Sequence, residues 1–178
     1  MIKEKATSTF TEVRKGRIWK LGDDISTDDI ISGKYLEIRD PDKLAMHVFE
    51  GIFDSFPEEV CFGDIIIAGK NFGSGSSREQ APMLLKKLGI QMICAKSFAR
   101  IFFRNAINLG IPLFTIHENI TKKFTNGERI HYTINPPIIQ GDTHKQEVKL
   151  APFPDFFYKI LQKGGAIEIL KEFLRKNN

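Results

Sequence analysis

The chain has 178 residues, of which 42% are hydrophobic, so we expect one domain with a substantial core. Its net charge of +4 is spread along the chain without a DNA- or RNA-binding motif, which disfavours a role in nucleic-acid binding. There is no apolar run of about 18 residues, and the polar start lacks the core of a signal peptide. We therefore expect a cytoplasmic protein with no transmembrane helix and no membrane partner.

Strand-like and helix-like patterns alternate along the chain and predict an α/β fold. Residues 1–12 are polar and predict a loose N-terminal arm, ahead of a single domain over residues 13–178. In chain order, the patterns predict a strand at 16–21, an acidic loop at 22–29, a helix at 41–49, a strand at 65–68, a glycine-rich turn, a helix at 78–88, a strand at 91–95, a helix at 98–109, strands at 112–116 and 130–134, and helices at 153–162 and 166–176.

The glycine-rich turn at residues 71–77 (NFGSGSS) lies between a predicted strand and a predicted helix. Ser77 with Gln80, or Ser76 with Glu79, has the spacing of a capping box. Amide groups at a helix start favour an anion, and Arg78 adds a positive fork that suits carboxylate or phosphate. The turn lacks the third glycine of a dinucleotide fingerprint and the Gly-Lys-Ser/Thr of a P-loop. An ordinary capped turn remains an alternative on spacing alone.

Other polar groups are less distinctive. The acidic loop at 22–29 (GDDISTDD) lacks the glycine and glutamate pattern of an EF-hand, and a solvated loop explains it equally well. Arg100 and Arg104 stand one helical turn apart on a predicted amphipathic helix. Cys61 and Cys94 are isolated in sequence, so we expect buried thiols and no metal site made by this chain alone.

Three blocks together resemble the swivelling domain of the aconitase family, and they follow one another in that family's order. They are residues 22–30 (GDDISTDDI), 64–79 (DIIIAGKNFGSGSSRE) and 97–108 (SFARIFFRNAIN). The resemblance implies the swivelling β/β/α fold. A freestanding chain of this length is similar to the small subunit of a two-chain hydro-lyase of the 3-isopropylmalate dehydratase type.

The resemblance also implies how the work is divided between two subunits. A partner large subunit would carry a four-iron four-sulfur cluster, whose open iron binds a small hydroxy-dicarboxylate, and this chain would bind no cofactor. The implied reaction interconverts 2- and 3-isopropylmalate in leucine biosynthesis. By motif match Ser76 is the base, and Ser77 and Arg78 bind a substrate carboxylate. Asp28, as a second catalytic residue, and Thr27, as a substrate-binding residue, belong to the supporting acidic loop.

Substrate choice is implied to rest on the segment Tyr35–Arg39, which matches neither family pattern cleanly. Ile38 is placed to face an isopropyl group, whereas Arg39 is placed to reach an additional carboxylate. The alternatives are therefore a homoaconitase or a methylmalate dehydratase small subunit. A non-catalytic module that binds a carboxylate or RNA is an alternative of another class, which the presence of the serine and the arginine disfavours.

Overall fold

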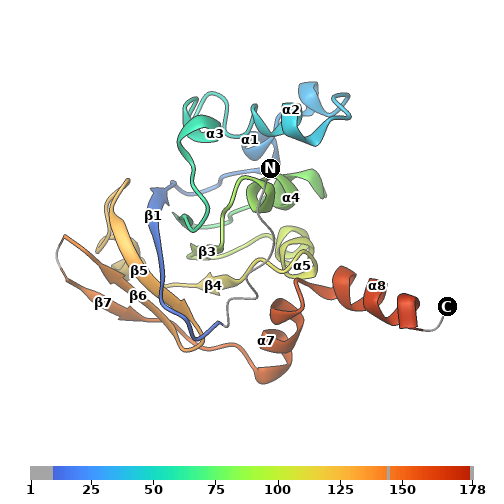
Figure 1. Cartoon of the computed structure of the whole chain (residues 1–178). Coiled ribbons are helices and arrows are strands. Elements are labelled where there is room, and N and C mark those ends of the chain that lie inside the picture. The colour runs from blue at the N-terminus through green and yellow to red at the C-terminus, as the bar shows by residue number, and fades with distance from the viewer. Residues whose placement is uncertain (1–9, 144, 177–178) are drawn as a thin grey trace.

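The computed structural model describes residues 10–143 and 145–176, and it has the mixed α/β character that the sequence predicts (Figure 1). The strands are β1 (Arg14–Lys20), β2 (Ile65–Ala68), β3 (Met92–Ala95), β4 (Leu113–Thr115), β5 (Arg129–Ile134), β6 (Pro137–Gly141) and β7 (Glu147–Lys149). The helices are α1 (Thr27–Ile30), the 3-10 turn η1 (Gly33–Tyr35), α2 (Pro41–Ala45), α3 (Phe56–Glu59), α4 (Gln80–Lys87), α5 (Arg100–Asn108), α6 (Glu118–Thr121), α7 (Asp155–Gln162) and α8 (Ala166–Lys176).

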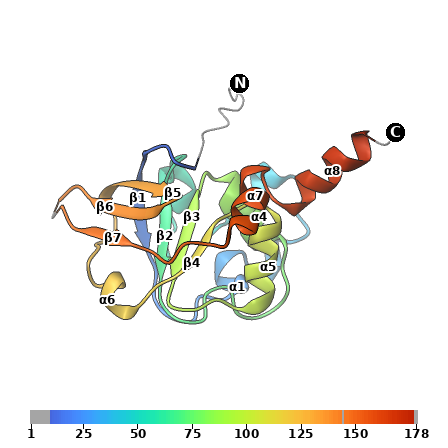
Figure 2. The ribbon, with the colours of Figure 1, turned by 90° about the horizontal axis from the view of Figure 1, so that it is seen from below.

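The seven strands form one sheet in the order β4-β3-β2-β1-β5-β6-β7. The strands from β1 to β4 run parallel, whereas β5, β6 and β7 pair in antiparallel fashion. β1 joins the two halves, because Ile18–Lys20 pair with β2 and Arg14–Arg17 pair with β5. The sheet curls about this shared strand (Figures 1 and 2).

The hydrophobic core extends along the whole sheet, and its most completely buried strands are in the parallel half. Every residue of β2 and β3 is buried, which is typical of parallel strands covered on both faces. Helices α4 and α5 lie together against this half (Figure 2), and Leu84, Leu85 and Phe102 contribute side chains that are at most 2% exposed. The apolar sequence between residues 65 and 95 therefore forms a rigid support for the loops at the strand ends.

The C-terminal helices confirm the break expected between residues 162 and 166. Gly164 and Gly165 have φ values of +83° and +111°, and a Cβ on Gly165 would lie 2.1 Å from the carbonyl oxygen of Asn108. α8 then projects away from the body of the molecule (Figure 1). None of the helices in the described part of the chain has the length and apolarity needed to span a bilayer.

Two predicted elements differ from the structure. The helix expected at 41–49 ends at Ala45, because Phe49 takes a left-handed conformation (φ +60°) and is buried in the core. The segment expected as a loop at 22–29 contains the start of α1, whose N-cap is Ser26. The elements α3, α6, β6 and β7 have no counterpart in the predicted series.

Most of the predicted N-terminal arm, residues 1–9, lies outside the described residues. Where the described chain begins, Phe10 is 8% exposed. Its carbonyl oxygen accepts hydrogen bonds from the amides of Ile134 and Asn135 at 3.1 and 3.0 Å. The end of the expected arm is therefore bonded to the end of β5.

Candidate active site

The glycine-rich turn, here defined as Gly69–Glu79, connects β2 with α4. The helix begins at Gln80, and its N-cap Glu79 has helical backbone angles and makes no side-chain cap. The predicted capping boxes at Ser76 and Ser77 are therefore wrong. Because the helix begins after both serines, their hydroxyls do not accept hydrogen bonds from its first amides. Both residues are exposed.

The acidic loop lies along this turn and continues the pairing of β1 with β2 beyond the ends of the strands. The amide of Gly69 donates to Gly22 O at 2.9 Å, and the amide of Gly73 donates to Ile25 O at 2.7 Å. In the opposite sense, the amide of Thr27 donates to the Ser74 carbonyl oxygen at 2.7 Å. Two loops that are separated by some 47 residues in sequence are thus joined by backbone hydrogen bonds.

Two left-handed residues face each other across these loops. Asp24 and Asn71 both have φ +58°, and Asn71 Nδ2 donates to Asp24 Oδ1 at 3.0 Å. Asn and Asp are the side chains that best tolerate this conformation. The amide of Asn71 also donates to Ser97 Oγ at 2.8 Å. Non-glycine residues at positive φ concentrate at functional sites, where surrounding contacts hold them.

Arg78 is fixed by the acidic loop. Its Nη1 donates to Asp28 Oδ1 and, at 2.9 Å, to the carbonyl oxygen of Ile31. The Asp28 carboxylate also accepts from the amide of Gly33 at 2.9 Å. The hydrogen bond from Arg78, followed by that from Gly33, lowers the pKa of Asp28, so this carboxyl group is ionised at neutral pH. Asp28 is thus suited to orienting Arg78 rather than to donating a proton.

Ser76 and Thr27 meet through the backbone. Thr27, which is 2% exposed, donates its hydroxyl to the Ser76 carbonyl oxygen at 3.0 Å. The amide of Arg78 donates to the same oxygen at 2.8 Å. These bonds hold the Ser76 backbone while its side chain stays at the surface. The structure therefore brings together Thr27, Asp28, Ser76 and Arg78, with Ser77 between the last two.

Gly73 must be glycine for two reasons. Its φ of +77° is strained for any residue with a Cβ. A Cβ at this position would also lie 2.2 Å from Cγ of Phe102, which is buried in α5. The ring of Phe102 packs edge-to-face on Phe72, with centroids 5.2 Å apart. The turn is thus shaped by a close approach to α5.

We expect Gly73→Ala to destabilise the fold by about 2–5 kcal/mol, as the sum of backbone strain and overpacking against Phe102. Gly127 is a matched control, because it has the same φ of +77° and open space around its Cα. Gly127→Ala should show only the backbone part, about 1–2 kcal/mol. Urea unfolding of both variants measures the difference. Equal losses would contradict a steric role of Phe102.

The proposed substrate-selecting residues lie apart from this cluster. Ile38 is half-buried and packs against the core, whereas Arg39 is exposed. No hydrogen bond or ion pair within the described residues joins either of them to Ser76, Ser77 or Arg78. The segment of Ile38 and Arg39 approaches Arg78 only through η1, which precedes it. The first residue of η1 is Gly33, where a Cβ would lie 3.1 Å from Arg78 Nη2.

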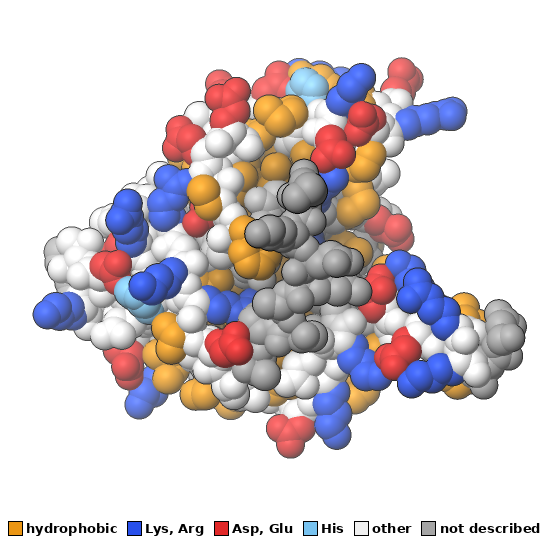
Figure 3. Space-filling model, in the orientation of Figure 1, with side chains coloured by type: hydrophobic (Ala, Val, Ile, Leu, Met, Phe, Trp, Pro, Cys, Tyr) orange, Lys and Arg blue, Asp and Glu red, His pale blue; other side chains and the backbone are white. Residues whose placement is uncertain are grey.

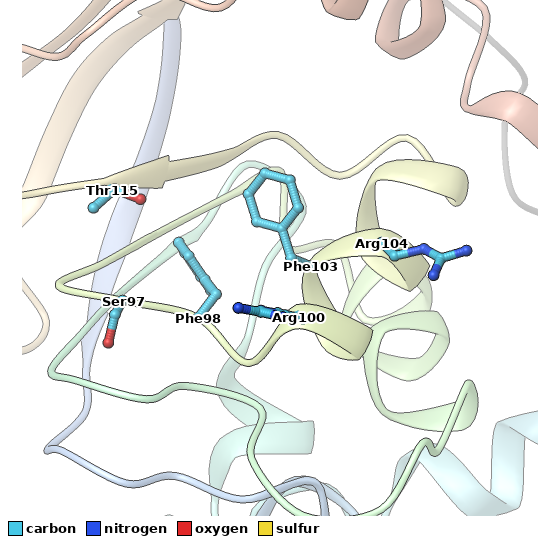
Figure 4. Close-up of a pocket in the computed structure, with 6 residues that line it drawn as sticks. All are labelled: Ser97, Phe98, Arg100, Phe103, Arg104 and Thr115. Atoms are coloured by element: carbon cyan, nitrogen blue, oxygen red, sulfur yellow. The ribbon is translucent and has the colours of Figure 1, made fainter.

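A hollow of about 490 Å³ lies beside α5 (Figure 4). Phe98, Phe103 and Thr115 line it, and the side chain of Arg100 points toward Phe98. Arg104 also lines the hollow, and its guanidinium extends away from Phe98. Ser97 also lines the hollow, and its Oγ accepts from the amide of Asn71, which joins the hollow to the glycine-rich turn.

The two cysteines behave differently from each other. Cys94 is fully buried in β3, and burial raises its thiol pKa, as expected for a structural thiol. Cys61 is exposed, so the expectation that it is buried is wrong. It lies in the turn before β2, which faces solvent. Within the described residues no group of three His, Cys, Asp or Glu side chains has the arrangement of a metal site.

Two contributors to the site, namely Gly33 and the carbonyl of Ile31, are not predicted from the sequence. Their only sequence signal is their position just after the acidic loop. Asp23 belongs to the predicted acidic loop, and its contacts are seen only in the structure, where it accepts from the amide of Lys70 at 2.8 Å and lies 3.7 Å from Lys96 Nζ. These groups act through the backbone of distant segments.

Comparison with known proteins agrees with this geometry. Residues 61–119, which include the glycine-rich turn and α5, match the aconitase C-terminal domain. The chain is 48% identical over 160 residues to 3-isopropylmalate dehydratase small subunit 1 of Methanopyrus kandleri, covering 90% of this chain and 94% of the relative. It is 49% identical over 156 residues to the small subunit 1 of Archaeoglobus fulgidus, covering 88% and 96%.

A solved structure gives the same result for the whole fold. The crystal structure of 3-isopropylmalate dehydratase from Methanocaldococcus jannaschii superposes with a TM-score of 0.83 at 39% identity, covering 94% of this chain and all of that one. The expected aconitase-type fold is therefore confirmed. With near-complete coverage at such identities, this chain belongs to the family of 3-isopropylmalate dehydratase small subunits.

Proposed function

We propose that this chain is the small subunit of a two-chain hydro-lyase that interconverts 2- and 3-isopropylmalate in the leucine pathway of the cytoplasm. The observation that carries the proposal is the Arg78 guanidinium, fixed by Asp28 and Ile31 beside two exposed serine hydroxyls. The named relatives are small subunits of that enzyme, which supports a large partner subunit.

An iron-sulfur cluster does not fit the donor set of this chain. Cys94 is enclosed in the sheet, Cys61 is alone at the surface, and a cluster needs several thiolates together. We therefore assign the four-iron four-sulfur cluster, with its Lewis-acid chemistry, to the large subunit. The contribution of this chain is limited to binding and proton transfer.

Arg78 is the group best suited to bind a substrate carboxylate. One of its two terminal nitrogens is held by Asp28 and Ile31, and a guanidinium has five N–H donors in a planar fork. The remaining donors suit a second, bidentate contact with a carboxylate. Ser77 is the adjacent hydroxyl on the same exposed turn. Both groups bind the acid and fix its orientation.

Ser76 is the proposed base, which removes a proton from the carbon next to the bound carboxylate. A serine hydroxyl is a weak base in water, so the step requires a closed, dry site in which nearby positive groups stabilise the alkoxide. The turn is open in the isolated chain, with Ser76 and Ser77 exposed. We infer that the large subunit closes this face, and that this chain alone is inactive.

The experiment that tests this function combines the chain with its cognate large subunit under anaerobic conditions. We expect isopropylmalate to be preferred over homocitrate, and Ile38→Ala to lower the specificity constant for isopropylmalate by about 10- to 200-fold. Arg39→Ala is the comparison variant and should leave that constant unchanged. Thermal melting separates this loss from the loss of packing, since Ile38 contacts the core.

Two outcomes would count against the proposal. A preference for homocitrate that disappears in Arg39→Ala would make Arg39 the selecting residue and the enzyme a homoaconitase. Dehydratase activity from this chain in the absence of a large subunit and of iron would contradict the proposal that catalysis requires both subunits.

A further inference from the structure

We propose that the outward face of β1 and β5 binds a small anion that carries two linked phosphate groups, at a site separate from the active-site turn. The register of these antiparallel strands places Lys15 directly opposite His131, and Arg17 directly opposite Arg129. Because alternate residues of a strand share a face, all four basic side chains lie on the same side of the two strands. We call these four residues the basic ribbon.

One of these pairs, Arg17 with Arg129, places two like charges directly opposite each other when the site is empty. Like charges directly opposite each other on neighbouring strands destabilise a sheet, whereas opposite charges stabilise it. Arg17 lies opposite Arg129 with both side chains permanently charged. A bound anion would replace this repulsion by attraction. A negatively charged ligand would thus relieve the repulsion between Arg17 and Arg129.

Two nearby carboxylates each pair with one member of the ribbon, and the other two members have no ion pair within the described residues. Asp142 Oδ1 lies 2.8 Å from His131 Nδ1 and is occupied by that ring. Asp64, whose side chain is 2% exposed, lies 3.7 Å from Arg17 Nη2 and accepts from the amides of Arg17 and Cys61 and from Trp19 Nε1. Arg17 Nη2 also donates to the carbonyl oxygen of Glu59. Lys15 and Arg129 are exposed, and neither forms an ion pair within the described residues.

The ribbon is part of a pocket of about 400 Å³, a size within the range of small-molecule sites. Cys61 and Phe62, from the turn before β2, line its other side. Phe62 is 82% exposed, an unusual position for a large aromatic ring. Figure 3 shows Lys and Arg side chains around a histidine over the strands at the left of the molecule.

The dimensions favour two linked phosphates over one. Two residues directly opposite each other on neighbouring strands have their Cβ atoms about 5 Å apart. Successive pairs on the same face of the sheet are about 7 Å apart along the strands. A single phosphate reaches one pair of cations, whereas a diphosphate reaches both. The exposed ring of Phe62 offers a stacking surface for a base. The ligand is therefore inorganic pyrophosphate or a nucleoside diphosphate.

The pocket lies at the opposite end of β2 from the catalytic turn. Cys61, Phe62 and Asp64 precede β2, whereas the glycine-rich turn follows it at Gly69. No residue of the glycine-rich turn or the acidic loop lines this pocket. Binding here is independent of the assignment of Ser76 and Arg78.

Calorimetric titration of the full chain with pyrophosphate, ADP and orthophosphate at constant ionic strength tests the proposal. We expect pyrophosphate to bind at least about tenfold more tightly than orthophosphate. Arg129→Gln and Lys15→Gln should each weaken pyrophosphate binding by about tenfold or more, because each removes a charge-assisted contact. Lys149→Gln is the matched control, since Lys149 is exposed on β7 of the same sheet and outside the pocket.

A second readout is the midpoint of thermal unfolding. Without anion, Arg129→Gln should unfold at a higher temperature than the wild type, because the repulsion with Arg17 is gone. Pyrophosphate should stabilise the wild type and not the variant. Tighter binding of ADP than of pyrophosphate, lost in Phe62→Ala, supports a nucleotide, and equal binding supports the diphosphate alone. Equal affinities for pyrophosphate and orthophosphate, or wild-type binding by Arg129→Gln, would overturn the proposal.

Discussion

Ser76→Ala is expected to lower the turnover of the assembled enzyme by about a hundredfold or more, which is the usual effect of losing a general base. The measurement is kcat at saturating isopropylmalate, with the large subunit present and its cluster fully occupied. Substrate binding should change less than turnover, because Arg78 and Ser77 remain in place.

The structure makes this loss specific to the hydroxyl. Thr27 and the amide of Arg78 contact Ser76 only through its carbonyl oxygen, which alanine retains. Ser76 does not cap α4, whose N-cap is Glu79, so the substitution removes no cap. The exposed side chain leaves no cavity. The unfolding free energy and the association with the large subunit should therefore stay near those of the wild type.

Ser74→Ala is the matched control in the same turn. Ser74 is half-buried and takes part through its carbonyl oxygen, which accepts from the amide of Thr27. Its replacement should leave turnover unchanged. Turnover of Ser76→Ala close to that of the wild type would show that the base lies elsewhere.

The capping pattern shows how far local sequence signals reach. A serine followed three residues later by an acidic side chain occurs at Ser26 and Asp29 as well as at Ser76 and Glu79. Only the first forms a capping box, with Ser26 Oγ accepting from the Asp29 amide at 3.1 Å. At Ser76, the backbone is held by Thr27 instead, which delays the helix to Gln80. The choice between the two sites depends on a contact that is distant in sequence.

Parts of the fold that depend on neighbouring residues are predictable from the sequence, whereas parts that depend on distant contacts are not. A few neighbouring residues are enough to determine the local structure of the apolar strands β2 and β3. The same is true of the break at Gly164 and Gly165 before α8. The strand β7 has three residues and takes its conformation from its pairing with β6. The pair of Arg78 with Asp28 spans 50 residues, so spacing alone gives no sign of it.

Arg78→Lys is expected to lower kcat/KM of the assembled enzyme by about a hundredfold, although it preserves the charge. Arg78 Nη1 serves Asp28 and Ile31 O at once, which leaves the rest of the planar fork for substrate. A lysine is a point charge on a flexible stem, so contact with Asp28 and bidentate contact with substrate exclude each other. Each charge-assisted hydrogen bond lost to the transition state costs about 1.5–3 kcal/mol.

Asp28→Asn separates the two functions of the arginine. The amide oxygen of asparagine can still accept from Arg78 and from the amide of Gly33, so the fork stays in place while the charge is lost. We expect a decrease in kcat/KM of about tenfold, smaller than for Arg78→Lys. Because the pKa of Asp28 is lowered, its carboxylate is charged throughout the neutral range. The ratio of the kcat/KM values of Asp28→Asn and Arg78→Lys should therefore not vary with pH in that range.

Arg104→Lys is the control for a conservative change of an arginine. Arg104 is exposed on α5 and lines the hollow beside this helix (Figure 4), and no hydrogen bond or ion pair within the described residues joins it to the glycine-rich turn, so its replacement should have no effect. If Arg78→Lys keeps the kcat/KM of the wild type, a single positive charge is sufficient and the fork has no role. If Asp28→Asn loses as much as Arg78→Lys, the carboxylate acts directly on substrate. A loss that is large for Arg78→Lys, small for Asp28→Asn and absent for Arg104→Lys is the result that requires a fork held by Asp28.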